Sequence, residues 1–254
     1  MFNAYHFRSM KPLTKTTWVL CFATAMGYLE AAVVVYLRAL YYPDGFAFPL
    51  KEMSQTLAVT ELYREVATLV MIFSIGVLAA KCWLHRFAWF LVVFSTWDIA
   101  YYVFLKLLLN WPASLFTTDV LFLLPSIWTG PVIAPVINSL TMLLLASVIL
   151  YVGDDQKHKL KLPAFSWVLL VLGSAIILAA YMKDFWEFAH QYRITHPESD
   201  LDSGATFLKL STRFIPRAFD WSLFISGVLM HLAAIVLIVR RRLKERLLKT
   251  EIHP

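Results

Sequence analysis

The sequence has 254 residues, of which 59% are hydrophobic, 15% are aromatic and only 16% are charged. This composition is too apolar for an ordinary soluble domain, whose helices alternate apolar and polar faces. The net charge is +6, but the basic residues from Arg240 to Lys249 directly follow an apolar segment. Orientation in a membrane and contact with anionic lipids therefore explain them better than nucleic-acid binding. The sequence contains no nucleotide-binding loop, zinc-spaced cysteine set or hydrolase signature, which argues against a nucleotide-driven pump or a soluble-type hydrolase.

Six apolar stretches are long enough to cross the roughly 30 Å hydrocarbon core of a bilayer as helices. They cover residues 16–38, 60–80, 87–109, 131–152, 164–183 and 217–239. We therefore predict an all-α, polytopic integral membrane protein, with residues 1–254 forming a single transmembrane domain. Residues 184–216 are expected to form an extracytoplasmic loop, and residues 240–254 a basic cytoplasmic tail.

The basic residues are unevenly distributed between the two sides of this predicted topology. Fourteen of the 23 lysine and arginine residues fall on the side that carries both termini. They are Arg8, Lys11, Lys15, Lys81, Arg86, Lys157, Lys159, Lys161, Arg240, Arg241, Arg242, Lys244, Arg246 and Lys249. Because lysine and arginine accumulate in cytoplasmic loops, both termini are predicted to be cytoplasmic, in a multi-pass protein of the cell (inner) membrane. An odd number of crossings would break this pattern.

The first predicted span places an acidic residue on a packing face. Ala23, Gly27 and Ala31 share one face of the helix, and such small side chains let a neighbouring helix approach closely. Glu30 belongs to the same face, so we expect it to point into the bundle in the outer half of the membrane. Arg38 lies about two turns further out. Glu30 would then serve either a structural ion pair or hydrogen bond, or a function.

The second predicted span begins with a charged cluster. Only residues 66–80 are freely apolar, so a full crossing needs residues 60–65 as well. This brings Glu61, Arg64 and Glu65 into the outer margin of the span. The two glutamates are four residues apart and share a helix face. Two interpretations remain open: a charged helix entry in the headgroup zone, or part of a polar site.

The third predicted span carries the most informative residue, Asp98, which lies near the middle of an apolar helix. An ionisable side chain there costs roughly a few kcal/mol or more unless it has a partner or water, so a functional role is favoured. Tyr101 and Tyr102 follow by three and four residues, so at least one phenol can reach the side of the helix that carries the carboxylate. If Asp98 were simply paired with Lys106 or Arg64, its role would be architectural.

Residues 110–130, between the third and fourth spans, are too short and too rich in proline for a crossing. Thr118 or Asp119 is suited to cap a short helix that ends before Pro125. We expect an interfacial or re-entrant hairpin on the outer surface. Irregular backbone at that depth needs protein or a water-filled cavity beneath it, so the segment would form a lid or wall over a polar site. The alternative is an aromatic belt that rests on lipid.

The later segments add few polar groups. Asn138 and Ser139, in the fourth predicted span, are placed to donate hydrogen bonds to the acids. Glu187 and His190 have the E-x-x-H spacing of carboxylate-bridged metal sites, but a single copy is a weak signal. No metal site is predicted, and hydrated loop residues are the simpler interpretation. His231 in the sixth span is interpreted as a hydrogen-bonded core histidine rather than a haem ligand.

These residues lead to three hypotheses about function. The first is a protein that handles a small solute, cation or proton in an acidic pocket in the outer half of the membrane. The residues expected to line that pocket are Glu30, Glu61, Arg64, Glu65, Asp98, Tyr101, Tyr102 and Asn138. The second is a membrane-embedded enzyme that acts on a lipid-like substrate. The third is an accessory subunit, whose charges pair among themselves or with other membrane subunits.

We rank the first hypothesis ahead because acidic groups recur on three spans at related depths. Its partner is the lipid bilayer, and no nucleic acid is expected. The sequence indicates no particular catalytic residue or cofactor.

Overall fold

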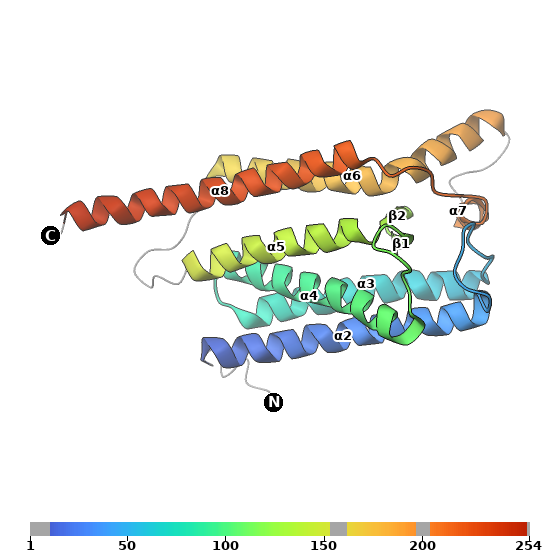
Figure 1. Ribbon diagram of the computed structural model, residues 1–254, viewed down its shortest axis with the longest axis horizontal. Coiled ribbons are helices and arrows are strands. Elements are labelled where there is room, and N and C mark those ends of the chain that lie inside the picture. The colour runs from blue at the N-terminus through green and yellow to red at the C-terminus, as the bar shows by residue number, and fades with distance from the viewer. Residues whose placement is uncertain (1–10, 153–161, 197–203, 253–254) are drawn as a thin grey trace.

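The computed structural model describes residues 11–152, 162–196 and 204–252, whose regular elements are helices and one two-stranded hairpin (Figure 1). The elements are α2 (Pro12–Tyr41), α3 (Gln55–Ala79), α4 (Trp83–Leu109), β1 (Thr118–Phe122), β2 (Trp128–Pro131), α5 (Ile133–Val152), α6 (Ala164–Thr195), α7 (Gly204–Ser211) and α8 (Trp221–Ile252). Within the described residues, all the helices except α7 are long and apolar enough to cross a membrane, six in total. This confirms the six predicted apolar helices and indicates a multi-pass membrane protein.

Helices α6 and α8 extend furthest beyond the apolar stretches that predicted them. Helix α6 continues to Thr195, so the first third of the predicted loop 184–216 is helical, and α7 accounts for a later part of it. Helix α8 runs through the basic segment to Ile252. Hydropathy marks only the part of a helix that suits lipid, whereas an established helix extends cheaply through charged residues until a stop signal occurs.

The bundle has two distinct ends (Figure 1). Helix α2 begins and α8 ends at the same end, which we call the tail end. The hairpin β1–β2, helix α7 and the loop 42–54 lie at the opposite end, which we call the hairpin end. An even number of crossings gives this arrangement. The cytoplasmic location of the tail end stays a prediction. Four of the basic residues on which it depends lie outside the described residues: Arg8, Lys157, Lys159 and Lys161.

The prediction of a short helix before Pro125 is wrong, because these residues form a β-hairpin. Strand β1 pairs antiparallel with β2, with Val120 opposite Thr129 and a register shift between Val120 and Phe122. β-branched and aromatic residues favour a pleated strand. The ladder also pairs backbone groups that a proline-interrupted helix would leave without partners. Asp119 is therefore not a helix cap.

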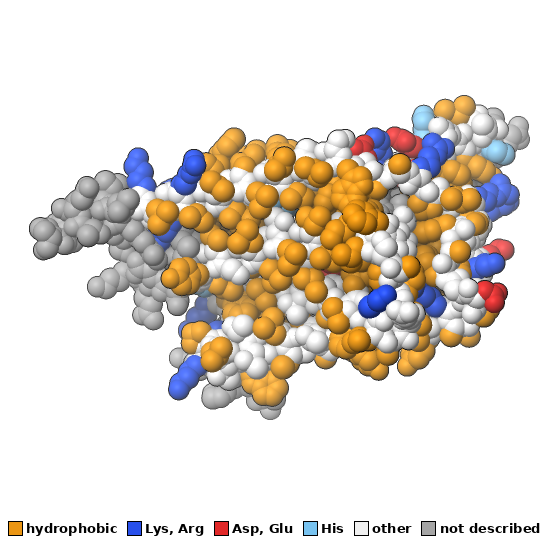
Figure 2. Space-filling model, viewed as in Figure 1, with side chains coloured by type: hydrophobic (Ala, Val, Ile, Leu, Met, Phe, Trp, Pro, Cys, Tyr) orange, Lys and Arg blue, Asp and Glu red, His pale blue; other side chains and the backbone are white. Residues whose placement is uncertain are grey.

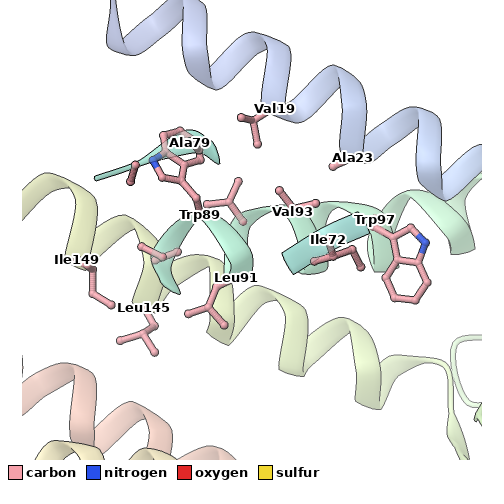
Figure 3. Packing of buried hydrophobic residues seen from close by; sticks show 14 of the residues in the cluster. Val19, Ala23, Ile72, Ala79, Trp89, Leu91, Val93, Trp97, Leu145 and Ile149 are labelled. Atoms are coloured by element: carbon pink, nitrogen blue, oxygen red, sulfur yellow. The ribbon is translucent and has the colours of Figure 1, made fainter. Parts of the chain in front are cut away.

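Helix α4 lies at the centre of one packing unit and contacts α2, α3 and α5. Figure 3 shows Val19 and Ala23 of α2 directed toward α4. They belong to one core cluster with Ile72 of α3 and Leu145 of α5. Helix α2 approaches α4 closely at Gly27, where a Cβ atom would lie 2.8 Å from the carbonyl oxygen of residue 97. This confirms that the small-residue face of α2 packs inside the bundle.

Helices α6 and α8 form a second unit, which reaches the first mainly through α5 and the hairpin. The pair is in close contact where Gly173 of α6 meets Gly227 of α8. Next to this contact, Nε2 of His231 lies 3.1 Å from the Leu170 carbonyl oxygen and 3.1 Å from the Ser174 hydroxyl. His231 is thus a buried, hydrogen-bonded core residue, as predicted.

The outer surface of the bundle is apolar. Figure 2 shows hydrophobic side chains across the visible long face, with Lys and Arg at the tail end and charges of both signs at the hairpin end. Large apolar side chains such as Leu29, Tyr36, Val70 and Leu172 are exposed. Such a surface would be a liability in water but suits contact with lipid tails.

Candidate functional site

A cavity of about 150 Å³ lies near the hairpin end, between α2, α3, α4, strand β1 and the loop 42–54. Seven of the eight predicted binding residues line it: Glu30, Glu61, Arg64, Glu65, Asp98, Tyr101 and Tyr102. Asn138 does not line it, and its buried Oδ1 has no hydrogen-bond partner in the described part of the chain. The acids of the first three spans therefore surround one space, while their role in binding stays a prediction.

Glu30 and Glu61 share one arginine. Arg64 of α3 forms an ion pair with Glu30 of α2, and its Nη2 lies 2.5 Å from Oε1 of Glu61. The Thr68 hydroxyl also donates to Glu30, at 3.5 Å. The three charged side chains are between 11% and 22% exposed. Since α2 and α3 pack mainly on α4 and hardly on each other, Arg64 is a principal link between them. The structural ion pair that the sequence left open for Glu30 is present.

Glu65 accepts hydrogen bonds from the main chain of the hairpin segment that lines the cavity. The backbone N–H of Leu123, just beyond β1, donates to both carboxylate oxygens of Glu65, at 3.0 Å and 3.1 Å. Glu65 is buried. In the described residues, no basic side chain lies within ion-pair distance of it. A backbone amide supplies a partial positive charge only, so the carboxylate of Glu65 is held in place without being neutralised.

Asp98 has a hydroxyl as its partner. Ser139 of α5 donates to its Oδ2 at 2.7 Å, which agrees with the predicted role of Ser139. The other oxygen, Oδ1, has no hydrogen-bond partner among the described residues. No ion pair of Asp98 occurs among them either. The aspartate is partly exposed and lines the cavity, so it presents its carboxylate to that space.

Arg38 and Asp119, which the sequence did not assign to the site, also line the cavity. We call the part around these two residues the upper part and the part around Asp98 the lower part. Arg38 lies 3.5 Å from Oδ1 of Asp119, and its guanidinium stands over the rings of Trp111 and Phe46, at 3.8 Å and 4.7 Å from their centroids. The Tyr102 hydroxyl donates to Asp119 at 3.4 Å. Burial raises the pKa of Asp119 to about 7, although Arg38 acts to lower it.

Aromatic rings form much of the remaining wall. Tyr101 and Tyr102 stand edge to face, with centroids 4.8 Å apart. Trp97 is 5% exposed, and its indole N–H has no hydrogen-bond partner in the described residues. Figure 3 shows the Trp97 ring at the edge of the core cluster, with its nitrogen turned away from the other labelled side chains. Trp97 also lines the cavity, but its nitrogen is enclosed within the wall.

The charges around the cavity do not balance. Five carboxyl groups line it, from Glu30, Glu61, Glu65, Asp98 and Asp119, against the two guanidinium groups of Arg38 and Arg64. Glu30, Glu61 and Asp119 form ion pairs with these arginines. Glu65 and Asp98 form none in the part of the chain that is described. The excess of three carboxyl groups therefore comprises Glu65, Asp98 and one of the two glutamates that share Arg64.

The remaining polar residues singled out by the sequence lie elsewhere. Lys106 does not reach the acids, because its Nζ donates to the carbonyls of Asn110 and Pro112, at 3.3 Å and 3.0 Å. Glu187 lies 3.9 Å from Lys183 on the surface of α6. Among the described residues, no three histidine, cysteine or acidic side chains gather closely enough to hold a metal ion.

No family model, curated protein or solved structure matches this chain. The functional argument therefore depends on the geometry and charge of the cavity.

Proposed function

We propose that this membrane protein binds a proton or a small cation in the acidic cavity and moves it across the membrane. The observation that supports this proposal is that Glu65 and Asp98 line the cavity without a basic partner among the described residues. The other three carboxylates of the cavity have arginine partners and are explained by architecture.

The physical reason is the cost of an uncompensated charge. Transferring an ionised carboxylate from water into an apolar interior is strongly unfavourable unless it is paired or neutralised. Ionisable residues within membrane helices therefore mark ion pathways and proton relays more often than they serve packing. A proton or a cation bound at Glu65 or at Asp98 would remove this cost for that carboxylate.

The surroundings provide a route and a cover. The strand β1 and the loop 42–54 contribute lining residues at the hairpin end, and we propose that the cation enters from this end. Following the charge asymmetry of the sequence, we assign the hairpin end to the extracytoplasmic side. The hairpin would then cover the polar site, which is the lid role predicted for residues 110–130.

The test is ion movement in reconstituted vesicles. Purified protein would be inserted into liposomes, and inward gradients of H⁺, Na⁺, K⁺ or choline would be applied in turn, with entrapped indicators or labelled choline as the readout. We expect the wild type to move at least one of them. The substitution Asp98→Asn, which keeps the shape and removes the charge, should reduce that flux at least tenfold.

The matched control is Asp44→Asn, which makes the same chemical change on an exposed residue of the loop 42–54. It should keep the wild-type flux. The proposal is overturned if none of the four ions moves, or if Asp98→Asn moves the ion as fast as the wild type. Loss of monodisperse, folded Asp98→Asn protein would instead support the accessory-subunit hypothesis, in which Asp98 is structural.

One observation favours the enzyme hypothesis as the second candidate. Val34, Leu37, Leu50 and Met53 also line the cavity, so part of its wall is apolar and suits the hydrocarbon portion of a lipid-like substrate. In that case Asp98 or Glu65 would act as a general base. Covalent change of a lipid added to the purified protein, detected by mass spectrometry and lost in Asp98→Asn, would distinguish this function from transport.

A further inference from the structure

We infer that the cavity takes a small organic ammonium ion that also carries a hydrogen-bond acceptor, such as a hydroxyl group. This inference rests on the proposed function and names the chemical class of its ligand. It depends on three observations: the way the protein binds its own Arg38, the unpartnered groups around Asp98, and the size of the cavity.

Arg38 shows how this site accommodates an organic cation. Its guanidinium is 3.8 Å from the centroid of Trp111 and 4.7 Å from that of Phe46, and it pairs with Asp119. Aromatic faces attract cations through their quadrupole, and the attraction is larger when water is excluded. The upper part of the cavity therefore binds a cation between aromatic rings and one carboxylate.

The lower part of the cavity has the same chemistry without a basic side chain. Asp98 provides the carboxylate, and Trp97 and Tyr101 line the cavity beside it. Among the described residues, no lysine, arginine or histidine pairs with Asp98, whose Oδ1 is unpartnered. An ammonium group supplied by a ligand would complete an arrangement that Arg38 completes in the upper part.

The indole of Trp97 gives a second, independent requirement. Its N–H is buried and has no partner in the described part of the chain. A buried donor without an acceptor costs about 1–3 kcal/mol. The nitrogen is enclosed within the wall, so a ligand reaches it when the indole turns toward the cavity. A bare ammonium or metal ion has no lone pair to accept this hydrogen bond, whereas an alcohol, ether or carbonyl oxygen on the ligand does.

The volume of the cavity limits the size of the ligand. A cavity of about 150 Å³ matches the roughly 150 Å³ of an apolar cavity that holds benzene. Choline is of that size and has both an ammonium group and a hydroxyl group. Inorganic divalent ions fit less well, because they need several oxygen ligands around one point. No cluster of three such ligands occurs among the described residues.

The test compares three probes on the full-length protein in detergent. Choline has the ammonium and the hydroxyl, tetramethylammonium has only the ammonium, and 3,3-dimethylbutan-1-ol is the neutral isostere of choline. Binding to the folded state raises the melting temperature in proportion to the logarithm of ligand concentration. We expect choline to raise it at the lowest concentration, tetramethylammonium at a higher one, and the neutral alcohol at a concentration at least tenfold above that of choline.

Variants then assign the binding to the cavity. Asp98→Asn should weaken choline binding at least tenfold, and Asp44→Asn should leave it unchanged. Trp97→Phe keeps an aromatic ring and removes the N–H, so it should reduce the advantage of choline over tetramethylammonium. Equal binding of choline and the neutral alcohol to the wild type overturns the inference without the need for any variant.

The failure of this inference can be distinguished from the failure of the proposed function. If choline does not bind, but the vesicles show H⁺, Na⁺ or K⁺ flux that Asp98→Asn abolishes, the site is a cation site of another class. If neither choline binding nor any flux occurs, both are overturned.

Discussion

The cavity and the α6–α8 interface both place polar side chains among apolar helices, but they treat those side chains differently. At the α6–α8 interface, His231 is held by the Leu170 carbonyl and the Ser174 hydroxyl, beside two glycines that let the backbones touch. In the cavity, the carboxylates outnumber the arginines. A polar residue in a membrane helix therefore indicates a site only when its partners have been counted and found insufficient.

The largest effect on stability is expected at the helix contact, where no ligand is involved. A Cβ atom at position 227 would lie 2.7 Å from the Gly173 carbonyl oxygen and 2.7 Å from Cγ1 of Ile177. Gly227→Ala should therefore push α6 and α8 apart and reduce the free energy of unfolding by about 2–3 kcal/mol. Unfolding in increasing SDS would measure this.

The control for that variant is Ser226→Ala, one residue away on the exposed face of α8, which should change stability little. The cation response of folded Gly227→Ala protein should equal that of the wild type, because the contact lies outside the cavity. A stable Gly227→Ala protein would show that the two helices are not held by close backbone contact.

A somewhat smaller effect is expected from removing the shared arginine. Arg64→Met keeps the length of the side chain but leaves Glu30 and Glu61 without a counter-ion. Breaking a fully buried ion pair costs about 3–5 kcal/mol. We expect about 1–2 kcal/mol here, less than for a fully buried pair, because the three side chains are 11–22% exposed and gain some solvation.

A second substitution separates charge from packing in this cluster. Adding Glu61→Gln to Arg64→Met removes one of the two orphaned charges and should restore part of the lost stability. If the double variant is less stable than the single one, the like charges of the glutamates are not the cause of the loss.

The last effect appears only as a pH dependence, at Asp119, and is small over any single pH unit. Its pKa in the folded protein is about 7, whereas an aspartate in an unfolded chain titrates near about 3.9. The folded state then binds more protons between these values, so stability should fall as the pH rises from about 5 to about 7. The slope is at most about 1.4 kcal/mol per pH unit.

Asp119→Asn cannot titrate and should lose this part of the pH dependence, while Asp44→Asn should keep it. Thermal unfolding at about pH 5, 6, 7 and 8 would compare the three proteins. Identical slopes for the wild type and Asp119→Asn would contradict a titration of Asp119 in this range.

The sequence predicts the helices and the gathering of acids well because both follow from periodicity. Apolar length sets the number of spans, and the i, i+3 and i+4 spacing places Glu30 beside Gly27 on an inward face. The same rule places Glu61 and Glu65 on one face of α3. Asn138 shows the limit of this reasoning, since adjacent residues on a helix point in different directions and Ser139 is the one that reaches Asp98.

The sequence does not predict the partners that depend on long-range packing. Asp119 looked like a helix cap because its local signals, a polar residue before an apolar run, are shared by helix starts and strands. Its contact with Arg38 joins residues 81 positions apart, and it forms only after the hairpin has folded over α2 and α4. One signal was available: an acid beside a strongly apolar run needs a buried partner, as Asp98 does.

The hydrogen bonds from Leu123 to Glu65 affect how substitutions at residue 123 are interpreted. The donor is a main-chain amide, and every amino acid except proline provides it. Alanine scanning would therefore report only the loss of the Leu123 side chain, which packs against the cluster that contains Phe185 and Phe214, and would leave the hydrogen bond in place. At position 123, proline or an ester in place of the amide would remove this hydrogen bond to Glu65 and so reveal its contribution.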